Sequence, residues 1–308
     1  MKIFKITTCC FSLICLTSLA AHNHEDDCPK FPGHCSSYPV GGDVALALDY
    51  FRSLPDGSWN GNTGIFSSLN LALGFPGQKR GFGAQAGGSY GVYDWDGRGS
   101  VPGGSKALQQ QGFLTLGLFR RTPDCKGLNA GLVYDFMFNK KFGVFGTNPQ
   151  LAQLRGQLGY LCEGRNEFGF WGTYDTQSSH RDPDEIPLKF RAVCQANLFW
   201  CHYFKNNGQT TLWAGTPYRR GLMYTDGRAG RYIFGGSFRA PLTKALSIIA
   251  HGSYMAARND PATIESKNYA ANVCFGVNYS FGGCEPSQRP YLALADNSNF
   301  IVDTNLNE

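Results

Sequence analysis

The chain has 308 residues, of which 39 are glycine, 43 are aromatic and only 17% are charged, with a net charge of +5. So many glycines exclude a helical bundle, since each glycine inside a helix costs about 1 kcal/mol. The aromatic content and the low charge exclude a disordered chain. What remains is an all-β protein whose surface is partly in contact with something other than water.

The N-terminus has the order of a secretory signal peptide. Lys2 and Lys5 precede an apolar run over 6–19, and small residues stand three and one before a cut after Ala20. The run is shorter than the roughly 20 apolar residues that an anchoring helix needs. We therefore expect a signal peptide over 1–20 and a periplasmic segment over 21–41. Loss of the two lysines lowers the net charge from +5 to +3, which is too small to predict a nucleic-acid partner.

Twelve segments then alternate apolar residues with small or polar ones, with the period of two of a β-strand. The pattern is clearest at the last of them, where Val273, Phe275 and Val277 alternate with Cys274 and Gly276. The expected strands are 43–51, 64–75, 81–95, 108–121, 128–139, 150–162, 166–176, 187–204, 209–217, 231–240, 244–257 and 268–281.

The connections between these strands alternate in length. The gaps after the second, fourth, sixth, eighth and tenth strands are short and carry turn residues, whereas the other gaps are longer. A secreted β-sandwich would also alternate faces, but alternating turn lengths and aromatic strand ends favour a membrane barrel. We therefore predict an all-β fold: a transmembrane antiparallel β-barrel of about 12 strands over 42–283, with short periplasmic turns, longer extracellular loops and outer-membrane lipid around it.

A short motif in the last expected strand supports this prediction. The sequence from Gly276 through Tyr279 to Phe281 resembles the Gly-x-x-aromatic-x-aromatic signal that closes bacterial outer-membrane barrels and is read by the barrel-assembly machinery. Such signals usually end the chain, whereas 27 residues follow Phe281 here. We expect residues 284–308 to hang in the periplasm as a tail, with both chain ends on that side, or to fold back into the barrel as a plug.

Several stretches resemble a family of uncharacterised porin-like outer-membrane barrel proteins of planctomycetes and chlamydia-like bacteria. The resemblance covers about 42–305 and implies a bacterial outer-membrane location and a porin-like shape. It implies no catalytic residues. The stretches that carry it are Phe113–Arg121, Gly131–Asp135, Gln153–Gly156, Glu167–Trp171 and Ala295–Phe300.

Eight cysteines remain after the signal peptide, an even number in an oxidising compartment. Six of them collect near one rim of the expected barrel, where disulfides would tether the rim and the chain ends or link neighbouring envelope proteins. The resemblance to chlamydia-like envelope proteins implies such cross-links, and inert thiols are the alternative. The spacing of Cys28 and Cys35 is not that of a zinc site, so we predict no metal and no cofactor. The disulfide candidates are Cys28, Cys35, Cys125, Cys162, Cys201 and Cys284.

Ten charged residues fall on the inward side of the expected strands. Six basic against four acidic residues predict a channel with a mild preference for anions. The alternative is that these charges pair across the lumen and close it, since a twelve-stranded barrel is intermediate in width between filled barrels and porins. The pore-lining candidates are Asp43, Asp49, Asp135, Asp175, Arg121, Arg155, Lys189, Arg191, Arg231 and Arg239.

An enzymatic alternative depends on His251 and Ser253, which share one face of an expected strand. The pair is similar to the His-x-Ser of outer-membrane phospholipase A, but there it faces lipid and here the alternation points it inward. We therefore predict a porin-like passive channel for small solutes and no enzyme. A structural envelope protein linked by disulfides is the second prediction, and a lipid hydrolase is the third.

Overall fold

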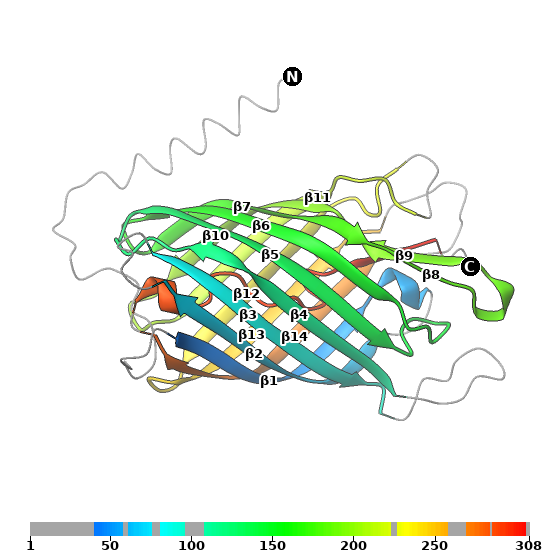
Figure 1. Ribbon diagram of the computed structural model, residues 1–308, viewed down its shortest axis with the longest axis horizontal. Coiled ribbons are helices and arrows are strands. Elements are labelled where there is room, and N and C mark those ends of the chain that lie inside the picture. Colours follow the sequence, from blue (N-terminus) through cyan, green and yellow to red (C-terminus); the bar gives the residue numbers. More distant parts are fainter. Residues whose placement is uncertain are drawn as a thin grey trace, which may run out of the picture.

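The computed structural model describes residues 40–57, 61–75, 81–95, 108–222, 227–257, 269–283 and 285–305. In this part of the chain, twelve antiparallel strands form a closed barrel, which confirms the predicted fold class (Figure 1). The strands are β1 (Val40–Arg52), β2 (Asn62–Gly74), β3 (Phe82–Tyr93), β4 (Gln109–Arg120), β5 (Gly127–Lys140), β6 (Gln150–Cys162), β7 (Asn166–Gln177), β10 (Gln195–Tyr203), β11 (Gln209–Pro217), β12 (Ile233–Pro241), β13 (Leu246–Met255) and β14 (Ala270–Gly282).

The two faces of each strand meet different surroundings, as the alternation predicts. On β1, Leu46 and Leu48 are 56% and 60% exposed on the outside, whereas Ala47 and Asp49 between them are buried. Exposed apolar residues recur on the outer face of the other strands in the same way. Such a continuous apolar band is unfavourable against water and is typical of a barrel surrounded by lipid.

The barrel closes where β14 pairs with β1. Gly276 lies opposite Ala47 in this pairing, and a Cβ atom at position 276 would lie only 2.3 Å from the carbonyl oxygen of Leu46. The predicted assembly motif therefore lies in the closing strand, with Tyr279 52% exposed on the outside. Gly276 allows the two backbones to approach because it carries no side chain.

One expected strand is two separate strands. The alternating segment 187–204 divides into β9 (Leu188–Ala192) and β10, because β9 leaves the barrel and pairs with β8 (Ser179–Arg181) and β15 (Val302–Thr304). This small sheet extends beyond the end of the barrel where the longer connections lie, which we call the loop end (Figure 1). We call the opposite end, with the short connections, the turn end.

Three short 3-10 helices complete the described elements: η2 (Leu54–Asp56), η3 (Pro183–Glu185) and η4 (Pro286–Gln288). No helix among the described residues has the length and apolar character needed to cross a membrane.

Residues 285–305, which we call the tail, run through the inside of the barrel. The tail begins at the turn end with η4, which contacts β1, β2 and β3, and ends at the loop end as β15 (Figure 1, orange to red). Its last described residues therefore lie at the opposite end from the one where we expected both chain ends.

The loop end is filled by an apolar core, which we call the apolar cap. Phe300 of the tail is 1% exposed and packs against Phe113 of β4, with ring centroids 5.9 Å apart. The cap closes the barrel around the point where the tail leaves it. Its buried residues are Phe51, Tyr93, Phe113, Met137, Phe142, Val144, Leu151, Leu188, Phe190, Ala192, Ala295, Phe300 and Val302.

Candidate functional site

The inner wall of the barrel is lined mainly by neutral polar side chains. A buried amide needs a hydrogen-bond partner, and Gln85, Gln153 and Gln195 find one on the backbone of the tail. The buried amide residues of the wall include Gln85, Gln109, Gln111, Asn129, Gln153, Gln195, Asn197, Asn272 and Asn278.

The middle of the tail is held by side chains of β3, β4 and β6. Gln85 binds both backbone groups of Leu292: its Nε2 donates to the carbonyl oxygen over 2.6 Å, and its Oε1 accepts from the amide nitrogen over 3.2 Å. Arg155 donates to the carbonyl oxygen of Ala293 over 2.8 Å, and the amide of Ala295 donates to Thr115 Oγ1 over 3.0 Å. These side chains replace the strand partner that the backbone of the tail lacks.

Further contacts hold the tail toward the loop end. Gln153 and Gln195 both donate to the carbonyl oxygen of Asn299, over 3.3 and 3.1 Å. Beyond the barrel, Asp303 of β15 forms an ion pair of 2.9 Å with Arg191 of β9. Burial raises the pKa of the Asp303 carboxyl, and Arg191 opposes that shift.

At the turn end, Tyr291 of the tail is held by side chains of the wall. Its hydroxyl donates to Glu167 Oε1 over 2.6 Å, and Arg121 lies over its ring, 6.0 Å from the centroid. Tyr203 donates to the other carboxylate oxygen of Glu167. Sequence reasoning missed Glu167, although its position two residues before the inward Gly169 and four before the inward Trp171 would have placed it in the lumen.

The charges of the wall are paired. Asp135 and Arg155 form an ion pair of 2.8 Å in which both side chains are at most 4% exposed, and Asp43 and Arg239 form another of 2.8 Å. Asp135 and Arg155 lie on the adjacent strands β5 and β6, so this pair does not bridge the lumen as the alternative expected. Asp49 is buried and accepts hydrogen bonds from neutral groups.

Three other predicted pore-lining residues lie outside the lumen, which corrects the expectation, whereas Asp175 belongs to barrel strand β7, opposite Gln153 of β6. Lys189 and Arg191 belong to β9, because that segment turns away from the barrel to pair with the tail. Arg231 is exposed ahead of β12 at the loop end, and Asp175 near the end of β7 faces Arg219 at 3.6 Å. The basic excess expected in the lumen therefore disappears.

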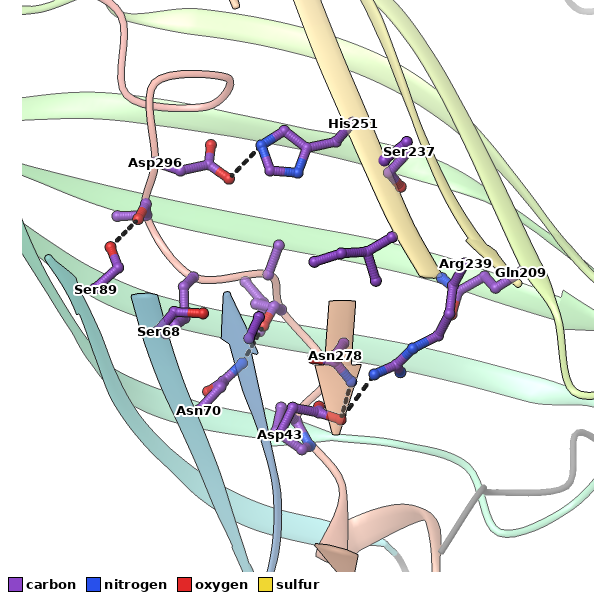
Figure 2. A pocket seen from close by; sticks show the side chains of 18 of the residues that line it. Asp43, Ser68, Asn70, Ser89, Gln209, Ser237, Arg239, His251, Asn278 and Asp296 are labelled. Atoms are coloured by element: carbon purple, nitrogen blue, oxygen red, sulfur yellow. Dashed lines mark hydrogen bonds and ion pairs between the residues drawn. The ribbon is translucent and has the colours of Figure 1, made fainter. Parts of the chain in front are cut away.

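The tail leaves free space on one side of the lumen. Two cavities of about 260 and 170 Å³ lie beside it, and both are bordered by Ser237, His251 and Asp296. Figure 2 shows the larger one between the tail and the strands that carry Asp43 and His251. This space is lined by polar groups and is wide enough for water.

The hydrolase arrangement is not assembled in the described part of the chain. His251 and Ser253 both point toward the lumen, and the structure gives no hydrogen bond between them. Instead, His251 Nε2 lies 3.3 Å from Asp296 Oδ2 of the tail. A serine nucleophile needs the histidine within hydrogen-bond reach.

The six disulfide candidates divide into three groups. Cys162 and Cys201 carry thiols, so their prediction as disulfide partners is wrong; Cys201 is 3% exposed and packs beside Trp171 and Phe199 inside the barrel. Cys125 is disulfide-bonded, and no disulfide joins two of the described cysteines. The candidates Cys28, Cys35 and Cys284 lie outside the described residues.

Comparison with a solved structure of TM-score 0.50 supports the barrel fold. The chain is similar to an outer membrane channel from Pseudomonas putida F1, with a TM-score of 0.50, 12% identity, and coverage of 81% of this chain and 99% of that one. It also matches outer membrane phospholipase A from Escherichia coli, with a TM-score of 0.45, 11% identity, and coverage of 77% and 92%. At such identities the likeness concerns the fold alone.

The remaining comparisons concern the sequence. No curated protein matches the chain significantly. One family model matches residues 44–302, which span β1 to β15 and so include both the barrel and the tail inside it. The chain therefore belongs to the family of unknown function DUF6666.

Proposed function

We propose that this protein is an outer-membrane channel for small polar solutes that rests closed, with its own tail as the plug. The apolar outer band and the closed barrel support an outer-membrane location, reached after removal of the signal peptide near Ala20. The polar inner wall suits polar solutes, since the polar interior of an outer-membrane barrel is either a water-filled channel or is occupied by a plug.

The observation that carries the proposal is the way in which the tail is held. Between η4 and β15 the tail belongs to no strand, and it is bound by side chains such as Gln85 and Gln153. It can therefore leave without breaking the backbone hydrogen bonds of the barrel. Water would then solvate the same amide groups.

The cavities beside the tail mark the route for solutes. They lie on the side of β11 to β14, where Gln209, Ser237 and Asn278 contribute small or neutral polar groups. The charges there include the Asp43–Arg239 ion pair. Paired charges predict weak ion selectivity in place of the anion preference that the sequence predicted.

Assembly and partners form a further part of the proposal. β14 completes the barrel, and its outward Tyr279 and the neighbouring Phe281 are suited to recognition by the barrel-assembly machinery. Lipid surrounds the apolar band. Disulfide links to other envelope proteins remain a prediction for the cysteines outside the described residues.

Planar lipid bilayers test the proposal. Leu292 is 1% exposed and packs with Phe119 and Val133, so Leu292→Asp would bury a charge and release the tail. We expect few openings of the full-length wild-type protein and frequent openings of Leu292→Asp. Leu242→Asp is the matched control, because Leu242 is exposed in the β12–β13 turn. Equal conductance of wild type, variant and control would overturn the proposal.

A further inference from the structure

Three chemically reactive side chains lie side by side on the inner wall. In the strand register, Asp49 of β1 is opposite Cys274 of β14, and Cys274 is opposite His251 of β13. All three point inward. One potential ligand atom from each lies within 4.8 Å of the other two. The residues are more than 200 positions apart in the sequence at their extremes, so only the barrel closure brings them together.

The tail adds a fourth potential ligand to this row. Asp296 Oδ2 lies 3.3 Å from His251 Nε2, and Figure 2 shows the two side chains facing each other across the lumen. The histidine nitrogen is buried but has no aligned hydrogen bond. Two ligands bound to zinc at about 2.0 Å with tetrahedral angles stand about 3.3 Å apart. The pair is thus spaced as two zinc ligands are.

Among the described residues, no lysine or arginine is paired with the two carboxylates of this row. Asp49 is 4% exposed, and it accepts hydrogen bonds from Tyr93, Asn272 and Asn297, all of them neutral. The ion-pair partner of Asp296 is the His251 imidazole, which carries a charge only when it is protonated. A buried carboxylate without a cation is costly, and a divalent ion between the two carboxylates would neutralise both.

We propose that Asp49, His251, Cys274 and Asp296 form a binding site for a zinc-class divalent ion. Nitrogen, sulfur and carboxylate oxygen together favour zinc over calcium or magnesium, which take oxygen ligands. Binding takes the thiolate form of Cys274 and releases its proton. Tyr93 and Asn272 hold the Asp49 carboxylate in place, as groups behind metal ligands do. The ion joins the tail to the wall in the middle of the lumen.

Metal binding by the purified full-length protein tests the site. We expect zinc to be retained after dialysis, at one ion per chain by elemental analysis, and cobalt to give a thiolate charge-transfer band. Cys274→Ser removes that band and weakens zinc binding by more than about tenfold, because even groups behind the ligands contribute about 10- to 100-fold. Cys201→Ser is the matched control: it removes another buried inward thiol and leaves both results unchanged.

A second variant keeps the test independent of the stability of the wall. Asp296→Asn changes only the tail, and it too should weaken zinc binding by more than about tenfold. Zinc binding equal to wild type in both Cys274→Ser and Asp296→Asn, or no zinc retained by the folded wild type, would overturn the site. Zinc binding is measured without any conductance recording. A failure of the metal site can therefore be distinguished from a failure of the channel proposal.

Discussion

At the scale of single residues, Arg155 has two roles at once. Its guanidinium pairs with Asp135 and also donates to the backbone of Ala293 in the tail. It therefore links the charge balance of the wall to the position of the plug. Asp135 in turn accepts hydrogen bonds from Thr115 and Gln153, so its charge is satisfied on all sides.

The first prediction concerns this pair. Arg155→Met should lower the free energy of unfolding by about 3–5 kcal/mol, because it leaves the carboxylate of Asp135 buried without its cation. Urea titration of the refolded barrel measures the loss. The double variant Arg155→Met with Asp135→Asn should recover part of it. A loss below about 1 kcal/mol in the single variant would contradict the importance of the pair.

The second prediction concerns the closing strand. Gly276→Val should cost about 1–3 kcal/mol through overpacking, because its side chain would collide with the backbone of β1 at Leu46. The temperature at which the folded band disappears from gels measures the change. Gly156→Ala is the control, since a Cβ there would meet its nearest neighbour at 3.6 Å. Equal behaviour of the two variants would contradict the close approach.

Sequence alternation predicted which residues point inward but not which of them meet. Asp43, Asp135, Arg155 and Arg239 were predicted to line the lumen, yet their pairing depends on strand register, which a period of two does not determine. For the same reason the row of Asp49, Cys274 and His251 could not be seen in the sequence. It becomes visible once the register is known.

At the scale of elements, strands were easier to predict than the tail. Eleven expected strands match single barrel strands within a few residues, because each carries its own alternation. The prediction of a single strand over 187–204 was wrong, because β9 alternates like a barrel strand but pairs with Val302–Thr304 of the tail. The sequence left open whether the tail hangs free or folds back into the barrel, because its place in the lumen depends on wall residues distant in sequence.

The third prediction concerns the docking of the tail in the apolar cap. Phe300→Ala should loosen the tail by about 3–5 kcal/mol, the usual cost of removing a buried Phe, because the ring loses its contact with Phe113. Hydrogen exchange of residues 289–301 measures the loosening. Phe234→Ala is the control, as Phe234 is 49% exposed on the outer face. Unchanged protection in Phe300→Ala would contradict a docked tail.

At the scale of the whole molecule, the barrel separates three environments. Its outer face is apolar, its inner wall is polar, and the tail occupies part of the lumen between the apolar cap and the Tyr291 contacts at the turn end. This arrangement accounts for the composition: the low charge corresponds to the outer band, and the glycines are frequent where strands and tail approach closely.

The fourth prediction follows from the outer band. The protein should fractionate with outer membranes and should run on gels as a compact band that changes mobility after boiling, because a closed antiparallel barrel unfolds only when its whole ladder is broken. Gel mobility before and after heating, together with membrane fractionation, checks this. A freely soluble protein with one mobility would contradict the membrane barrel.

In our proposal the docked tail closes the lumen, and a reversible covalent lock on the tail tests this claim. A Cβ atom at position 131 would lie 3.2 Å from Cγ of Leu292. In a cysteine at position 292, the sulfur would take the place of that Cγ atom. The double variant Gly131→Cys with Leu292→Cys should therefore form a disulfide between the wall and the tail. The measurement is the bilayer conductance of this double variant before and after reduction, at a urea concentration that leaves the barrel folded. The wild-type protein, treated in the same way, controls for reduction of the native cysteines. We predict no openings when oxidised and openings when reduced; the same conductance in both states would contradict the claim.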